Sequence, residues 1–443
     1  MPISSRYRYP NASFNIANLN DIRHGMVRFT SSFGLILTLL LTSCGGPDAG
    51  SNALSEAVLT PSVSAEQQRL EDFFTATWAE DLVRYPASAS YLGVNDRQDQ
   101  WNDVTESFQL ASLAITRQRL DFLNGIDTSQ LSEDRLLSYR LYRLDLERTL
   151  AGAPFRHHRY VIHQFRGPHT SPVSLLINVH AINSMQDAEA YIARLNNLPL
   201  YFDGVVEQIQ IRADKGLFLV DWMIPKIIES ASNVLLGAPF DAGDEPSVIW
   251  ADFNDKLDQL ALAPAEINQL REDARSALFN AVRPAYQKLI AAVRSQQDRA
   301  MPEDGVWRFP DGEAFYANRL NVFTTTSLTA AEIHQAGLDN VERLHSEMRA
   351  VMAELGERGD LSAFLERVRS DQALRFPNTE EGRSAYLDAA RTAIDDMAKR
   401  LPAYFGVLPR AALVVKRVEA YRERSAGKAF YQRPPSDESR PGL

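Results

Sequence analysis

The folded part of the chain opens with a helical pattern of apolar positions. The segment SAEQ, Ser64 to Gln67, is a capping box, in which the serine oxygen and the glutamine three residues later satisfy opposite backbone amides. The side chains that follow recur near helical spacing and predict one buried stripe, made of Leu70, Phe73, Phe74, Thr77 and Leu82. Pro86 is expected to close this helix.

Two more helices are marked by their first turns. One begins at Ser132, because residues 133–134 are acidic and the helix dipole favours negative charge there. Its apolar side chains fall on one face, as Leu137, Leu141 and Leu144. The clearest helix begins with a second capping box, Thr329 to Glu332, and ends at Gly356. Its predicted stripe consists of Val341, Leu344, Met348, Met352 and Leu355.

A further helix begins at Ser184 and stops at Gly216, and Pro199 is expected to kink or split it. Alternation of apolar and polar residues is rare by comparison. Residues 159–165 and 411–421 are the two good strand candidates. The sequence therefore predicts a mainly α protein, a multi-helix array with a small edge sheet.

The N-terminal region has the pattern of an export signal. Residues 34–41 form an apolar run that is too short for a membrane-spanning helix, which needs about 20 residues. Arg28 precedes the run, and Leu-Thr-Ser-Cys follows it, which matches the bacterial lipoprotein box with Cys44 as the lipidated residue. We therefore predict that residues 1–44 are a signal peptide. Met26 would start a better signal and is a candidate for the true start.

Residues 45–63 are rich in small and polar side chains and predict a flexible tether between the lipid and the folded part. Gly45 stands where an aspartate would retain many Gram-negative lipoproteins in the inner membrane. The expected location is therefore the cell envelope, with the lipid in the outer membrane and the protein facing the periplasm. The membrane is the first predicted partner, through this N-terminal lipid.

Net charge argues against one class of partner, and cysteine content argues against disulfide bonds. The net charge is −10, which argues against nucleic acid, because phosphates need clustered lysine and arginine. Cys44 is the sole cysteine of the 443 residues, so no disulfide is expected once it carries lipid. The sequence sets no oligomeric state.

Five of the eight histidines lie between residues 156 and 181, which raises the question of a metal site. No two of them stand four residues apart on a helix, and no neighbouring carboxylate completes a ligand set. Ordinary hydrogen-bonded histidines are the favoured interpretation, so we expect no metal and no cofactor in this chain. The loop GPHTSP, Gly167 to Pro172, still presents three hydrogen-bonding side chains between two prolines. A nucleophile elbow, a P-loop and a dinucleotide fingerprint are absent from the sequence.

Several segments together resemble one bacterial family, catalogued as domain of unknown function 885, which includes many exported lipoproteins. The resemblance runs from about Ser64 to the end of the chain, and its segments are RYPASASYLGVNDRQDQW (84–101), LSEDRLLSYRLYRLDLE (131–147), QFRGPHTSP (164–172), residues 305–338 and residues 401–442. In that family, a strand and a His-Glu-x-x-Pro-Gly-His helix follow the counterpart of YQRPPSDESRPG. This arrangement is similar to gluzincin metallopeptidases.

The resemblance implies that residues 64–443 are the helical N-terminal portion of such a protein, incomplete at the C-terminus. It implies zinc in the complete family protein and peptide hydrolysis as the reaction, with a peptide as the second predicted partner. This chain lacks the zinc motif, so it is expected to be inactive as given, and no catalytic residue is assigned. The candidate substrate-binding residues are Tyr431, Arg440 and His169, because a phenol or a guanidinium can stabilise an oxyanion or hold a carboxylate.

Two other interpretations stay open. The chain could be a non-catalytic helical lipoprotein that binds peptides or acts as a scaffold, or it could be a remnant of a split gene. For each candidate residue a structural role is also available. Arg440 could cap a loop, Tyr431 could pack, and His169 could belong to a turn.

Overall fold

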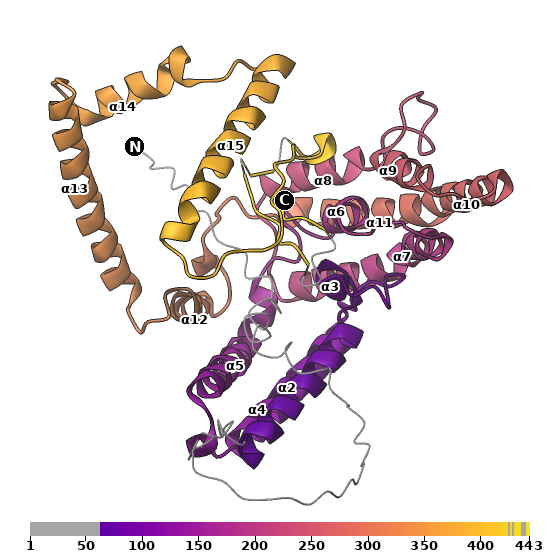
Figure 1. The fold of residues 1–443 in the computed structure, drawn as a ribbon, viewed down its shortest axis with the longest axis horizontal. Helices are drawn as coiled ribbons and strands as arrows, with labels where there is room; N and C mark the ends of the chain where they lie inside the picture. The colour runs from indigo at the N-terminus through magenta and orange to yellow at the C-terminus, as the bar shows by residue number, and fades with distance from the viewer. Residues whose placement is uncertain (1–62, 424–425, 428, 436–439) are drawn as a thin grey trace, which may run out of the picture. The chain divides into compact units, whose positions relative to one another are not determined.

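A computed structural model describes residues 63–423, 426–427, 429–435 and 440–443. The described chain is mainly α-helical, as the sequence predicts (Figure 1). Its α-helices are α2 (Ala65–Arg84), α3 (Pro86–Tyr91), α4 (Glu106–Asn124), α5 (Glu133–Gly152), α6 (Ser171–Asn178), α7 (Met185–Asp214), α8 (Met223–Asn233), α9 (Val248–Leu257), α10 (Pro264–Ala277), α11 (Arg283–Arg294), α12 (Gly312–Thr324), α13 (Ala330–Glu354), α14 (Leu361–Ser370) and α15 (Glu380–Arg400).

Three of the predicted helix starts are confirmed by their caps. The capping box predicted at Ser64 is half formed, because the Gln67 side chain donates to Glu71 and accepts from the Ser132 amide. The Ser64 hydroxyl accepts a hydrogen bond from the Gln67 amide at 3.0 Å, and the Ser184 hydroxyl accepts one from the Asp187 amide at 3.2 Å. At α13 the capping box is complete, because the Thr329 amide donates to the Glu332 carboxylate at 2.8 Å while the Glu332 amide donates to the Thr329 hydroxyl at 3.3 Å.

The chain divides into two compact units. The first consists of the described part of residues 1–77 together with residues 116–147. Its core is small and contains three aromatic side chains among its seven members, Leu70, Phe74, Leu123, Ile126, Tyr139, Tyr142 and Leu146. Three predicted members of the first stripe, Leu70, Phe74 and Thr77, are buried.

The second unit consists of residues 78–115 and 148–443. Its main core lies where α7, α8, α10 and α11 pack together (Figure 1). The rings of Tyr191, Phe202, Phe253 and Tyr286 are fully buried in this core, where Tyr191 and Phe253 form a tilted pair and Phe202 and Tyr286 meet edge to face. Large aromatic side chains of this kind contribute most of the buried apolar area of a helical core.

Two sequence predictions need correction here. The split predicted as one of two outcomes at Pro199 does not occur, because α7 continues through this residue as one helix. The predicted face Leu137, Leu141 and Leu144 of α5 is exposed, while Ser138, Tyr139, Tyr142 and Leu146 are buried. Bulky aromatic residues fill the inside of this unit, and the leucines on the neighbouring face are left outside.

The two predicted strands are also not formed as strands in the described residues. Residues 159–165 contribute one isolated bridge, His163 with Arg166, and residues 411–421 contribute another, Leu413 with Gly442. The amides and carbonyls of Gln432 and Leu443 exchange two hydrogen bonds of 2.7 and 2.8 Å beside that second bridge. A strand needs a continuous ladder of partners, which these short pairings do not supply.

No helix in the described ranges has the length and apolar character that crossing a membrane requires. The predicted signal peptide, its Met26 start, Cys44 and nearly all of the predicted tether, residues 45–62, lie outside the described residues.

Candidate functional site

The loop GPHTSP forms a tight turn that leads into α6. The Gly167 carbonyl accepts hydrogen bonds from the amides of Thr170 (3.0 Å) and Ser171 (2.9 Å). Gly167 has a φ of +154°, and a Cβ there would lie 3.0 Å from Ile162 Cγ1 and 3.2 Å from His169 Nδ1. Glycine is therefore needed at this position, both for the backbone and for the close approach of His169. Pro172 stands in the first helical turn, where its fixed φ suits a helix start.

His169 is fully buried by this turn, with no exposed surface. Its backbone carbonyl accepts a hydrogen bond from the Tyr286 hydroxyl at 3.0 Å. In the described part of the chain, neither ring nitrogen has a hydrogen-bond partner. Burial lowers the pKa of the imidazole from its ordinary value of 6.5 to about 3, so the ring is neutral at physiological pH. A neutral imidazole carries one donor and one acceptor, and each unsatisfied buried group costs about 1–3 kcal/mol.

The other histidines of the cluster behave as the sequence predicts. His157 Nε2 lies 3.0 Å from the Glu106 carboxylate, and His158 Nε2 lies 2.7 Å from the Pro310 carbonyl oxygen. His163 Nδ1 accepts from the Phe165 amide at 3.3 Å, and His180 Nδ1 lies 3.1 Å from a guanidinium nitrogen of Arg194. His169 differs from these four because neither of its ring nitrogens is engaged.

Arginines gather around the half-buried Tyr91 at the end of α3. Burial raises the pKa of this phenol. Positive charges act in the opposite direction, and in decreasing order they come from Arg440, Arg422, Arg166 and Arg194. Arg440 Nη2 donates to the Tyr91 carbonyl oxygen at 3.2 Å. The guanidinium groups of Arg166 and Arg422 both lie over the Phe430 ring, at 5.6 and 5.2 Å from its centroid.

Tyr421, next to Arg422 in the sequence, connects this arginine group to the turn that holds His169. The Tyr421 hydroxyl donates to the Thr170 carbonyl oxygen at 3.4 Å, and burial raises the pKa of Tyr421. Arg422, the next residue, forms an ion pair of 2.6 Å with Glu419, which also accepts a 2.6 Å hydrogen bond from the Asn178 amide group at the end of α6. We call His169, Tyr91, Arg166, Arg422 and Arg440 the α6 site.

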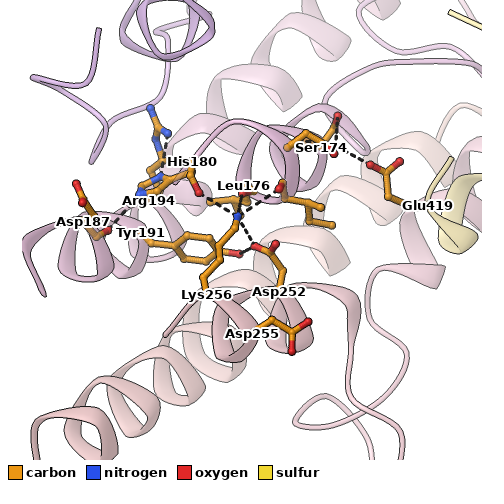
Figure 2. A network of polar contacts seen from close by, with 12 residues as sticks. Ser174, Leu176, His180, Asp187, Tyr191, Arg194, Asp252, Asp255, Lys256 and Glu419 are labelled. Atoms are coloured by element: carbon orange, nitrogen blue, oxygen red, sulfur yellow. Dashed lines mark hydrogen bonds and ion pairs between the residues drawn. The ribbon is translucent and has the colours of Figure 1, made fainter. Parts of the chain in front are cut away.

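Lys256 also contacts the C-terminal end of α6 (Figure 2). Its ammonium group donates to the carbonyl oxygens of Leu176 (2.7 Å) and His180 (2.9 Å) and to Asp252 Oδ2 (2.8 Å). The Tyr191 hydroxyl donates to the same Asp252 oxygen at 3.0 Å. Burial raises the pKa of Asp252 and lowers that of Lys256, while their mutual attraction opposes both shifts. A cation at a helix C-terminus satisfies its last carbonyl groups, so this network is structural.

The sequence predicts three substrate-binding residues, and the structure places them in different surroundings. His169 is buried in the α6 turn, and Arg440 is half-buried beside Tyr91. Tyr431 is 62% exposed and lies near Gly442, where a Cβ would come within 3.1 Å of its ring. It therefore stands outside the buried group.

Sequence reasoning missed Tyr91, Arg166, Tyr421 and Arg422. All four lie within the separate segments that carry the family resemblance. That these segments converge on one place in the fold is the signal that could have found them.

Two further features do not belong to this site. Within the described ranges, no three histidine, cysteine, aspartate or glutamate side chains are grouped so as to hold a metal ion. A surface groove of about 430 Å³ lies between α7 and α10 and is lined by Ile192, Leu270 and carboxylates such as Glu189 and Glu266, with none of the α6 site residues.

The α6 site thus lies in a mainly helical fold. Residues 86–443 match the family described as "Bacterial protein of unknown function (DUF885)", and the chain belongs to this family. No curated protein matches the sequence.

Two solved structures are similar. One is described as a "putative lipoprotein" from Colwellia psychrerythraea (TM-score 0.74, 18% identity, covering 86% of this chain and 67% of that chain). The other is a "putative lipoprotein of unknown function" from Shewanella oneidensis (TM-score 0.50, 14% identity, covering 79% of this chain and 60% of that chain). At these identities the similarity is one of fold.

Proposed function

We propose that this chain is the part of a lipid-anchored DUF885 protein that holds a peptide substrate at the α6 site. The observation that carries this proposal is the His169 imidazole, which is fully buried and whose ring nitrogens have no hydrogen-bond partner among the residues that the structure describes. A buried polar group without a partner costs stability and is rare in native proteins, so its retention points to a ligand. A peptide backbone has N–H donors and carbonyl acceptors. The acceptor nitrogen and the donor nitrogen of one neutral imidazole can each bind one of them.

The arginines favour an anionic group on that ligand. Arg166 is exposed, and Arg422 and Arg440 are half-buried, so positive charge extends from the protein surface to the Tyr91 phenol. Guanidinium groups bind carboxylates through paired hydrogen bonds, and they do so best in a partly desolvated place. A peptide with a free C-terminal carboxylate fits this combination. Since His169 has no exposed surface, binding requires a local opening of the turn.

The expected setting is the cell envelope. The lipoprotein box at Cys44 and the descriptions of the two similar structures support an N-terminal lipid anchor. Gly45 supports the outer membrane, with the folded part in the periplasm. In this setting the membrane holds the protein, and periplasmic peptides are its ligands.

The metallopeptidase resemblance implies zinc, but the described residues do not supply a ligand set for it. We therefore assign no hydrolytic step to them and propose that this chain binds peptides without cleaving them, as one part of a larger family protein. The alternatives are a binding or scaffolding lipoprotein that is complete in itself and a remnant of a split gene. DNA directly downstream that encodes a His-Glu-x-x-Pro-Gly-His segment would support an origin in a metallopeptidase-like protein and would remove the support for a binding or scaffolding lipoprotein.

Peptide capture tests the proposed function. Purified protein is incubated with a pool of four- to six-residue peptides that carry free C-terminal carboxylates, and with the same pool amidated. Bound peptides are identified by mass spectrometry and their affinity is measured by calorimetry. We expect binding of the carboxylate pool only. His169→Leu and Arg166→Met should each weaken it about 10- to 100-fold, the effect of losing one hydrogen bond to a charged group.

The matched control is Arg343→Met on α13, which removes an exposed arginine outside the site and should leave affinity unchanged. Circular dichroism checks that all variants keep their helical content. Failure of both pools to bind, or equal binding of the amidated pool, would overturn the proposal.

A further inference from the structure

α5 carries a row of exposed leucines in the first unit. Leu137, Leu141 and Leu144 are 56, 52 and 40% exposed. They follow one another at steps of four and three residues, and residues at this spacing are neighbours on one face of a helix. We call these three side chains the leucine stripe.

The other helices of the first unit do not share this property. Within residues 65–77 and 116–124, the parts of α2 and α4 that belong to this unit, every large apolar side chain is buried or half-buried. The leucine stripe is therefore the apolar surface that the helices of this unit leave to solvent. A continuous apolar row of this kind is typical of a surface that binds another helix.

The stripe has the heptad register of a two-stranded coiled coil. With Leu137 and Leu144 at d positions, Leu141 stands at the a position between them, and apolar residues at a and d form the seam of such a pair. The core residues Tyr139 and Leu146 then fall at f positions, on the far side of the helix from the seam. The leucine stripe and the core of the unit therefore use opposite sides of α5, so the stripe is open to a partner.

Two exposed charges flank the stripe, Arg140 at the g position and Asp145 at the following e position. In a parallel pair of helices, a g residue of one helix lies beside the next e residue of the other, and the charges at g and e set partner and orientation. A second copy in the same register brings Arg140 of each chain beside Asp145 of the other. An antiparallel pair would instead bring the two arginines together. Charge complementarity therefore favours a parallel second copy of this chain.

We propose that the chain forms a parallel dimer through the leucine stripe of α5, with Arg140 and Asp145 of the two copies paired across the seam. A two-fold contact requires a surface that is complementary to itself, and a leucine row with opposite charges at g and e meets this requirement. Removal of the leucines of both copies from water supplies the driving force. The proposal uses neither the α6 site nor the lipid anchor, so it is independent of the proposed function.

Cysteine cross-linking tests the contact and its direction. Each variant is made in a Cys44→Ala background, so that the introduced cysteine is the single thiol of the chain. A disulfide joins residues whose Cα atoms lie within about 7 Å of each other, and equal d positions meet in a parallel seam. Leu137→Cys and Leu144→Cys should therefore each form a covalent dimer on mild oxidation. The matched control is Gln118→Cys on α4, an exposed position of the same unit, which should stay monomeric.

Charge exchange tests the flanking pair. Analytical ultracentrifugation of the purified chain in density-matched detergent gives the dissociation constant of the dimer. Leu141→Asp should raise this constant about tenfold or more, because it places a charge in the apolar seam. Arg140→Asp and Asp145→Arg should each raise it about 2- to 30-fold, since the exposed ion pair occurs twice in the dimer. The double variant Arg140→Asp/Asp145→Arg restores the attraction and should return the constant to within about threefold of the wild type.

Circular dichroism checks that all variants keep the helical content of the wild type. A wild-type chain that stays monomeric up to about 0.1 mM would overturn the proposal. So would cross-linking of Gln118→Cys as readily as of Leu137→Cys, or a charge-exchanged double variant that dimerises no better than the single variants. A disulfide that forms only between a Leu137→Cys chain and a Leu144→Cys chain would show an antiparallel contact and would also overturn it.

Discussion

The buried imidazole of His169 makes a quantitative prediction about stability and pH. Burial lowers its pKa in the folded protein to about 3, whereas the unfolded chain has the ordinary value of 6.5. Between pH 3 and pH 6.5, His169 is therefore mostly protonated in the unfolded chain and mostly neutral in the folded protein. Above pH 6.5 the titration of His169 does not reduce the free energy of unfolding. As the pH falls from 6.5 toward 3, proton binding to the unfolded chain lowers this free energy progressively.

From pH 7 to pH 5 the loss from one such histidine is about 2 kcal/mol. His180, whose pKa burial also lowers to about 3, adds a loss of the same kind. His169→Leu removes the first contribution and keeps the second. The variant should therefore lose about 2 kcal/mol less than the wild type over this interval, whatever the substitution itself does to stability at pH 7.

Urea unfolding at pH 7 and pH 5, followed by tryptophan fluorescence, measures this difference. All five tryptophans lie in the second unit, which also contains His169, so the signal reports on the relevant part of the chain. The control is His334→Leu, at an exposed position of α13, which should leave the wild-type difference unchanged. If His169→Leu loses as much stability as the wild type, the imidazole is solvated or paired in the folded protein, and the proposed peptide site loses its main support.

The remaining predictions concern the α6 network, the anchor and zinc. Lys256→Met leaves Asp252 and the last carbonyls of α6 without their cation and should destabilise the second unit by about 3–5 kcal/mol in urea unfolding, whereas Lys226→Met should change stability by less than about 1 kcal/mol. Cys44→Ala should abolish lipidation and shift the protein out of the membrane fraction, and unchanged membrane partition would contradict the lipoprotein assignment. Purified protein dialysed against a weak chelator should contain no stoichiometric zinc, and equimolar zinc by elemental analysis together with chelator-sensitive peptidase activity would refute this.

Local signals were enough to predict the helices and several of their ends. The serine and threonine caps at residues 64, 184 and 329 satisfy backbone amides within one turn, so their effect needs no tertiary contact. The helix stops at Gly216 and Gly356 follow from positive φ values of 75° and 73°, which glycine adopts without strain. Family membership was likewise visible in the sequence, since the resembling segments occur in a fixed order.

Packing decided what local patterns could not. The apolar face predicted for α5 is exposed because Tyr139 and Tyr142 fill the interior of the first unit, and periodicity alone does not rank two neighbouring faces of one helix. The predicted strands are single bridges because a strand requires a partner of matching length, which is a property of distant residues.

The candidate site shows the same division. From the sequence, His169 and Arg440 could be selected by residue type and by their place in resembling segments. Only the tertiary structure placed Arg440 beside Tyr91 and left Tyr431 exposed. It also buried the His169 imidazole without a hydrogen-bond partner among the described residues, while the other histidine rings of its cluster have one. Burial and hydrogen bonding depend on side chains that are distant along the chain, such as Tyr286 with His169 and Tyr421 with Thr170, and no spacing within one segment contains that information.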